Sequence, residues 1–329
     1  MVMRPWSGVR KRVIGEMQQH PLVHEKLRHR FRIIAFDWDG TAVKNRAAPV
    51  DDLLPRLETL MALDVKIVII TGTHLGNPNK QFCSKVRPEL KGNLFACVNR
   101  GAEVFGFDEA GEPVRLRGRD ANEEENRKMD RVSVELQQDF LERYGLDVVI
   151  IYDRYNRRKL DIIPTPEWSD PPKERIGELL VAVQQRLRDH GVAGGIQELI
   201  DRLNEKCREV GIPLRITTDV KHLEYGLSDK ADSVDWIIND LARDLGVPNE
   251  DVLFMGDEFG PIGGFDGSDF KMVSPVAKGA VYVSVGKEPN GVPDEVMYYG
   301  KGTEGFLEIC DGQIALWRDQ GPDAATNKE

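Results

Sequence analysis

The sequence lacks the features that define several large classes of protein. Its 329 residues include only four cysteines, which are scattered and form no Cys-x-x-Cys pair. This usage argues against a disulfide framework and against a zinc site, and it predicts reduced thiols in a cytoplasmic protein. No apolar run approaches the ~18 residues of a membrane span, so no membrane partner is expected.

The chain also has fewer basic than acidic residues. The chain has 45 Lys and Arg against 55 Asp and Glu, a net charge of −10. A protein that binds nucleic acid through its phosphates needs the opposite balance, so no nucleic-acid partner is expected. A small anionic ligand remains compatible, because it responds to the local field. Residues 1–30 form a basic extension with no apolar block, which does not match a secretory signal.

The most informative segment is an apolar run that ends in two carboxylates. Residues Ile33 to Phe36 are followed by Asp37 and, two positions later, by Asp39 in an Asp-Trp-Asp-Gly-Thr sequence. The run predicts a buried strand of a parallel sheet, whose carboxyl end is where open α/β sheets bind ligands. Two carboxylates ~4 Å apart repel by about 4 kcal/mol at an effective dielectric near 20. A divalent cation would offset this repulsion.

Two further segments carry groups suited to an oxyanion. Thr71 and Gly72 follow the apolar strand 65–70, and a hydroxyl beside free backbone N–H groups can bind an anion. Lys230 falls in the first turn of a predicted helix, where a cation opposes the helix dipole. A plain strand-to-turn threonine and a solvated lysine are the alternatives.

A fourth segment again places acids after a strand. Asp257 follows the apolar strand 252–255, and a loop rich in glycine and aspartate continues to Asp269. Such a loop supplies oxygen ligands for a hard cation, although it could be an acidic surface loop. Both Asp266 and Asp269 can complete the set.

The order of strands and helices predicts a doubly wound, Rossmann-like α/β core with a mostly parallel sheet. We expect this core over residues 31–105 and 225–317. The polar change after about residue 106 predicts an inserted α/β cap over residues 106–224. Residues 318–329 form a polar tail.

This order resembles the four motifs of the haloacid dehalogenase superfamily of phosphatases. The matching segments are Asp37-Trp38-Asp39-Gly40-Thr41, Ile69-Ile70-Thr71-Gly72, Lys230 and Gly256-Asp257. The insert resembles the C2, or type IIB, cap of the branch that includes sugar-phosphate phosphatases and phosphomannomutases. Asn99-Arg100-Gly101-Ala102 resembles the Asn-Gly-Ala turn of that branch, with an extra arginine.

The resemblance implies Mg²⁺-dependent hydrolysis of a phosphomonoester of a small metabolite, such as a sugar phosphate. Asp37 would be the nucleophile and Asp39 the general acid and base. Thr71, Gly72 and Lys230 would bind the phosphoryl group. Mg²⁺ would be held by Asp37, the main-chain carbonyl of Asp39, Asp257 and Asp269. A phosphomutase and a non-catalytic binding protein are the rival functions.

A cationic cluster in the predicted cap is the candidate for substrate selection. Arg154, Arg157 and Arg158 lie close together around a predicted β-turn. Guanidinium groups on a turn could hold a second anionic group or sugar hydroxyls. A solvated hairpin turn is the equally plain alternative. The sequence carries no signal for an oligomeric state.

Overall fold

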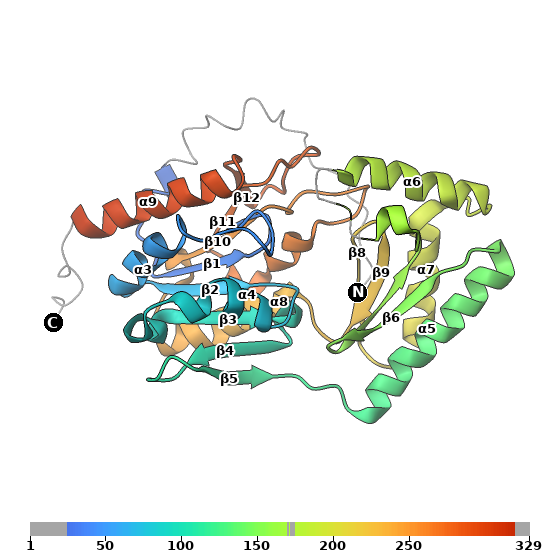
Figure 1. Cartoon of the computed structure of the whole chain (residues 1–329), viewed down its shortest axis with the longest axis horizontal. Helices are drawn as coiled ribbons and strands as arrows, with labels where there is room; N and C mark the ends of the chain where they lie inside the picture. Colours follow the sequence, from blue (N-terminus) through green and yellow to red (C-terminus); the bar gives the residue numbers. More distant parts are fainter. Residues whose placement is uncertain (1–24, 170, 172–174, 320–329) are drawn as a thin grey trace. The chain divides into compact units, whose positions relative to one another are not determined.

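The computed structural model describes residues 25–169, 171 and 175–319. It divides the chain into two compact units (Figure 1). Unit 1 contains the chain up to Gly118, Lys230–Pro261 and the chain from Asp266 onward. Unit 2 contains Arg119–Asp229 and the short segment Ile262–Phe265. Residues 1–24 of the basic extension and residues 320–329 of the polar tail lie outside the described residues.

Unit 1 is built on an eight-stranded sheet with the order β12-β11-β10-β1-β2-β3-β4-β5, which can be followed in Figure 1. The strands are β1 (Ile33–Asp37), β2 (Lys66–Ile70), β3 (Leu94–Val98), β4 (Glu103–Phe107), β5 (Pro113–Gly118), β10 (Val252–Gly256), β11 (Val281–Ser284) and β12 (Val296–Tyr298). Neighbours from β12 to β3 pair in parallel, and β4 and β5 add an antiparallel hairpin. The expected mostly parallel, doubly wound sheet is confirmed.

Alternation along the strands divides the core of unit 1 between two faces of the sheet. On β1, Ile34 and Phe36 pack with the helices α3 (Leu54–Ala62) and α9 (Thr303–Asp319). Ile33 and Ala35 pack on the opposite face with α8 (Lys230–Trp236). All five residues of β1 are buried, as expected for a strand covered on both sides. A shorter helix, α4 (Gly76–Gln81), follows β2.

The strand order reverses at β1. The chain builds outward from β1 through β2 to β3, and β10 then returns to the other side of β1. Such a point in a doubly wound sheet leaves a crevice at the carboxyl ends of the two central strands. The ends of β1 and β10 are the ends that carry Asp37 and Asp257. The topology therefore positions the acidic motifs at the place where this class of fold binds ligands.

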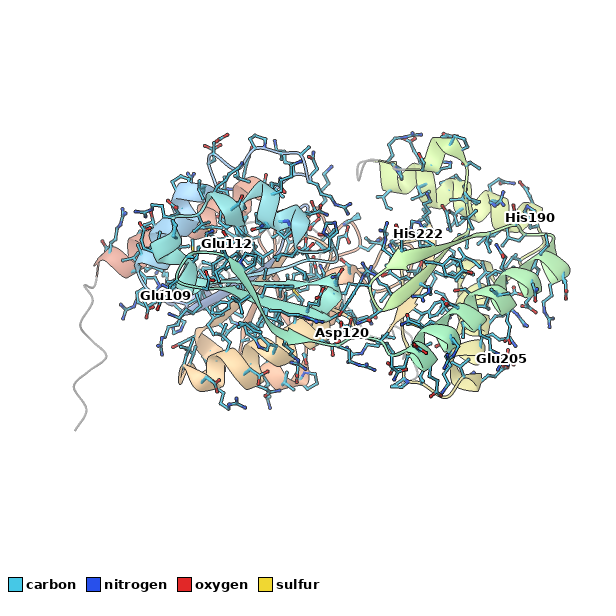
Figure 2. The ribbon with its side chains drawn as sticks, turned by 60° about the horizontal axis from the view of Figure 1, so that its bottom comes forward. Glu109, Glu112, Asp120, His190, Glu205 and His222 are labelled. Carbon is cyan, nitrogen blue, oxygen red and sulfur yellow. The ribbon has the colours of Figure 1, made fainter. Side chains whose placement is uncertain are left out.

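Unit 2 is a four-stranded antiparallel sheet with the order β6-β7-β9-β8. Its strands are β6 (Val149–Arg154), β7 (Arg157–Asp161), β8 (Arg215–Thr218) and β9 (His222–Gly226). Its helices are α5 (Glu123–Tyr144), α6 (Ile176–Asp189) and α7 (Gly195–Glu209); Figure 2 labels Glu205 on α7 and His222 on β9. The apolar side chains of the sheet and helices form one core. Within the described part of the chain, none of the helices combines the length and apolarity that crossing a bilayer requires.

The unit boundaries differ from those expected from the sequence. The polar stretch after residue 106 is the β4–β5 hairpin, whose turn carries Glu109 and Glu112 (Figure 2). Because this hairpin extends the sheet of unit 1, the boundary falls after Gly118 rather than after residue 105. At the other end, β9 keeps the chain in unit 2 as far as Asp229. The unexpected segment Ile262–Phe265 packs its two apolar side chains against the core of unit 2.

The core of unit 2 makes a stability prediction. Leu223 on β9 is fully buried in that core, so Leu223→Ala should lower the free energy of unfolding by about 2–5 kcal/mol. Val181→Ala is the matched control, because Val181 on α6 is 62% exposed; its effect should stay within about 0.5 kcal/mol. Urea denaturation followed by circular dichroism measures both. Equal losses in the two variants would contradict the assigned core.

Candidate active site

Asp37 is the last residue of β1 and begins the site. It pairs in register with Ile70, so Thr71 is the next residue on the adjacent strand. The side chain alternates to the same face as Ile33 and Ala35, which is the face covered by α8. Asp37 is 8% exposed. A buried carboxylate requires compensating partners, because removing its charge from water is costly.

Lys230 supplies the first of these partners. It is the first residue of α8, and its Nζ donates to Asp37 Oδ1 at 2.6 Å and to Asp269 Oδ1 at 2.5 Å. Burial lowers the pKa of Lys230, but the carboxylates of Asp269 and Asp37 outweigh burial and hold the pKa above its ordinary value. The ammonium is therefore charged at neutral pH and links two acids that are far apart in the sequence.

Asp257 follows β10 and lies beside Asp37. Thr41 Oγ1 donates to Asp257 Oδ1 at 2.9 Å, which fixes one oxygen of the carboxylate. Thr41 itself is fully buried in the turn after β1. The hydroxyl was part of the Asp-Gly-Thr pattern in the sequence, but only the structure assigns it a role. It connects the motif after β1 to the motif after β10.

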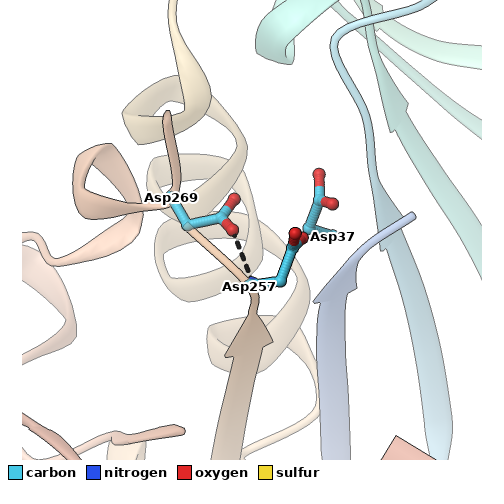
Figure 3. Close-up of side chains that lie close together, drawn as sticks. All are labelled: Asp37, Asp257 and Asp269. Carbon is cyan, nitrogen blue, oxygen red and sulfur yellow. Dashed lines mark hydrogen bonds between the residues drawn. The ribbon is translucent and has the colours of Figure 1, made fainter. Parts of the chain in front are cut away.

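Asp269, rather than Asp266, lies within the site. It is fully buried, and its Oδ2 accepts hydrogen bonds from the backbone N–H groups of Asp257 and Glu258, both at 2.9 Å; Figure 3 shows the bond to Asp257. Asp266 is partly exposed and approaches Lys271 at 3.5 Å. The structure therefore places Asp269 beside Asp257 and Lys230, where it braces the loop after β10.

The three carboxylates could hold a divalent cation. Asp37, Asp257 and Asp269 each offer an oxygen, and these atoms all lie within 4.8 Å of one another (Figure 3). With the ammonium of Lys230, these four groups leave a net negative charge in a largely buried place. A hard divalent cation prefers carboxylate oxygens and would neutralise that charge. The donor set therefore fits Mg²⁺.

Thr71 and Gly72 stand beside this cluster at the end of β2. Thr71 is 2% exposed, and its Oγ1 lies 3.2 Å from Thr73 Oγ1 and accepts a hydrogen bond from the N–H of Thr73, also at 3.2 Å. These bonds set the orientation of the hydroxyl. The loop places the hydroxyl of Thr71 at the strand end next to Asp37, and a hydroxyl can donate a hydrogen bond to an oxyanion.

Asp39 lies outside the three-carboxylate cluster. The chain turns after Trp38, with Gly40 at φ 100°, and Asp39 Oδ2 lies 3.4 Å from Arg46 Nε. Trp38 anchors the turn, because its buried indole donates to Gln81 Oε1 at 2.9 Å. Asp39 is 23% exposed at its side chain, so it is reachable from solvent while Asp37 is held in the buried cluster.

A glutamate that the sequence did not indicate supports the loop after β10. Glu288 accepts hydrogen bonds from the N–H groups of Phe259 and Gly260 at 2.7 and 2.8 Å, and from Ser284 Oγ at 2.7 Å. Burial raises the pKa of Glu288 to about 7, against the opposing effect of these donors. Glu288 is distant in sequence from Asp257 and follows no recognisable motif, so no local signal could have found it.

The arginines of unit 2 are not equivalent. Arg157 and Arg158 are neighbours on β7, so their side chains leave opposite faces of the sheet. Arg158 bonds to Asp130 on α5 at 2.5 Å, whereas Arg157 bonds to Glu224 on β9 at 3.1 Å. Arg154 is partly exposed and approaches Asp153 at 3.5 Å. The expected cluster of three is therefore divided: Arg158 secures a helix, and Arg157 lies on the polar face with Glu224.

Comparison with known proteins identifies the fold. No protein-family model matches the chain, and no curated protein matches it. Among solved structures, an IMP-bound IMP-nucleotidase of Plasmodium falciparum superposes with a TM-score of 0.55 at 12% identity, over 87% of this chain and 68% of the nucleotidase. A trehalose-6-phosphate phosphatase of Aspergillus fumigatus gives a TM-score of 0.51 at 17% identity, over 95% of this chain and 100% of the phosphatase. The expected fold, a doubly wound α/β core with an inserted second unit, is confirmed by these similarities.

The contacts of Asp269 make a prediction about the loop after β10. Asp269→Ala removes the acceptor of two backbone N–H groups and one partner of buried Lys230. Breaking a buried ion pair in this way should lower the free energy of unfolding by about 3–5 kcal/mol. Thermal and urea unfolding of the purified variant measure the loss.

Asp266→Ala is the control for that measurement. It removes the same side chain three residues away, but from a partly exposed position with one long contact to Lys271. Its effect should stay within about 0.5 kcal/mol. A larger loss from Asp266→Ala than from Asp269→Ala would reverse the assignment of the two aspartates.

Proposed function

We propose that this chain is a Mg²⁺-dependent phosphatase that hydrolyses a phosphomonoester of a small metabolite. The observation that supports this proposal most directly is the cluster of Asp37, Asp257, Asp269 and Lys230 at the reversal point of the sheet. An acid, a metal-binding acid pair and an ammonium beside an oxyanion loop are the components that phosphoryl transfer needs.

Asp37 is the nucleophile of the proposed reaction. One of its oxygens attacks phosphorus, the bond from phosphorus to the leaving alkoxide breaks, and an aspartyl-phosphate forms. Water then attacks the same phosphorus, the bond to Asp37 breaks, and inorganic phosphate leaves. The hydrogen bond from the ammonium of Lys230 to Asp37 Oδ1 orients the carboxylate for this attack.

Asp39 moves the protons. It donates a proton to the leaving alkoxide in the first step and accepts a proton from water in the second. Its partial exposure, at 23% of the side chain, allows exchange of that proton with solvent. Thr71, Gly72 and Lys230 bind the phosphoryl oxygens, which carry the charge of the transition state.

Mg²⁺ would be held by Asp37, Asp257 and Asp269 with the main-chain carbonyl of Asp39. When bound, it supplies positive charge that lets an anionic carboxylate approach an anionic phosphate. Thr41 orients Asp257 for this role through its bond to Oδ1.

The two solved structures named above support the proposed substrate class. One is an IMP-nucleotidase with IMP bound, and the other is a trehalose-6-phosphate phosphatase. We extend to this chain what these names share, a small phosphorylated metabolite, with a sugar phosphate as the first class to test. Arg157 is the remaining candidate for substrate selection in unit 2.

The four cysteines are free and buried, which supports a cytoplasmic location.

The nucleophile assignment is tested by Asp37→Asn. Hydrolysis of a generic aryl phosphate should fall by about 1,000-fold or more, because an amide oxygen cannot form the aspartyl-phosphate. Asp64→Asn is the control, since Asp64 lies in unit 1 and its side chain is 76% exposed; its activity should match the wild type. Turnover by Asp37→Asn near the wild-type rate would reject the assignment.

Product analysis with a hexose 1-phosphate separates hydrolysis from mutase activity.

The metal assignment is tested by removing and restoring Mg²⁺. Treatment with EDTA should abolish turnover, and added Mg²⁺ should restore it. Binding of Mg²⁺ at 100 times its Kd should also stabilise the fold by about 2.7 kcal/mol, seen as a higher Tm without any substrate. Asp257→Asn should lose this Tm shift. An unchanged shift in that variant would place the ion elsewhere.

A further inference from the structure

Arg100 stands at the carboxyl end of β3, the strand next to the oxyanion loop. Across the sheet, β10, β1, β2 and β3 are consecutive neighbours. Their carboxyl ends carry, in that order, Asp257, Asp37, Thr71 with Gly72, and the turn 99–101. The first three positions belong to the proposed reaction. The fourth position has a guanidinium that the proposed reaction does not use.

The backbone at this turn has three consecutive residues in the left-handed region, which strains it at Arg100. Asn99, Arg100 and Gly101 all have positive φ, at 52°, 57° and 80°. Glycine adopts this region freely and asparagine tolerates it, but a long side chain such as arginine is disfavoured there. The strained position is maintained by hydrogen bonds: Asn99 N–H donates to Thr73 O at 2.8 Å and Arg100 N–H donates to Thr71 O at 3.1 Å. Such strain concentrates at functional sites.

The side chain of Arg100 lies against the oxyanion loop. A Cβ atom placed on Gly72 would lie 3.7 Å from Arg100 Cγ and 3.8 Å from Arg100 Nε. The arginine stem therefore passes over Gly72 at van der Waals distance. The backbone partners of this turn, Thr71 for Arg100 and Thr73 for Asn99, belong to the same loop. The stem of Arg100, as far as Nε, is consequently positioned by the segment that carries Thr71 and Gly72.

We propose that Arg100 is an additional phosphoryl-binding residue, whose guanidinium donates hydrogen bonds to the phosphoryl oxygens held by Thr71 and Gly72. The inference rests on the proposed phosphatase function. Lys230 and the metal-binding acids approach the phosphoryl group from β1, β10 and α8, and Arg100 approaches it from β3, on the other side of β2. A guanidinium suits this position because it binds phosphate through two parallel N–H groups.

Binding of inorganic phosphate in the presence of Mg²⁺, measured by titration calorimetry, tests the proposal without turnover. Arg100→Gly should raise the Kd for phosphate by about 10- to 100-fold, which is the usual value of a charged hydrogen bond. Arg100→Lys should show an intermediate Kd, because lysine keeps the charge but not the paired donors. The kcat/KM for an aryl phosphate should fall in the same order.

Stability provides the second readout. Glycine accepts the positive φ at position 100 without strain, so Arg100→Gly should unfold at a urea concentration no lower than the wild type. Weaker phosphate binding without lost stability is the signature of a ligand-binding role, and a merely structural arginine would not give it. Arg87→Ala is the charge-matched control, because Arg87 lies in the same unit with its side chain 55% exposed.

Three results would overturn the proposal. The first is a phosphate Kd for Arg100→Gly within about twofold of the wild type. If the wild type also hydrolyses phosphate esters, this result would reject the role of Arg100 and leave the proposed function intact. The second is an equal weakening in Arg87→Ala, which indicates a general charge effect. The third is a wild type that neither binds phosphate nor hydrolyses its esters, which rejects the proposed function as well.

Discussion

The ammonium of Lys230 between two buried carboxylates is the interaction on which the site depends. It holds Asp37 at the end of β1 and Asp269 in the loop after β10, which come together only through the fold. Each of these ions is costly to bury, and removing Lys230 would take the shared cation from two buried carboxylates. Because Lys230 also begins α8, the same contact fixes where the chain re-enters unit 1. Site and fold are therefore held by one set of charges.

Much of the architecture of unit 1 could be predicted from the sequence. The buried strands are short apolar runs, and parallel strands present their carboxyl ends at one edge of a sheet. That rule is enough to bring Asp37, Thr71 and Asp257 to neighbouring strand ends without knowledge of the loops. A separate rule makes Lys230 a candidate. A cation at a helix N-terminus is unfavourable unless an anion lies nearby.

The remaining features depend on geometry that spacing does not encode. Only the folded loop distinguishes Asp269 from Asp266, because both aspartates belong to the same glycine-rich stretch of sequence. The register of β7 decides which of Arg157 and Arg158 reaches the polar face, and a shift by one residue would exchange them. The unit boundary after Gly118 depends on whether a polar hairpin joins the sheet, which its composition does not reveal.

The segment Ile262–Phe265 has a consequence for how such chains can be recombined. It interrupts the loop between Asp257 and Asp269, yet its apolar side chains pack against the core of unit 2. Excising residues 119–229 would leave Ile262 and Phe265 without that core, next to the acids of the loop. A graft of a foreign cap onto this scaffold would need a matching exchange of these four residues. Unit 2 consists of two separate segments of the chain, so removing one continuous segment cannot remove the whole unit.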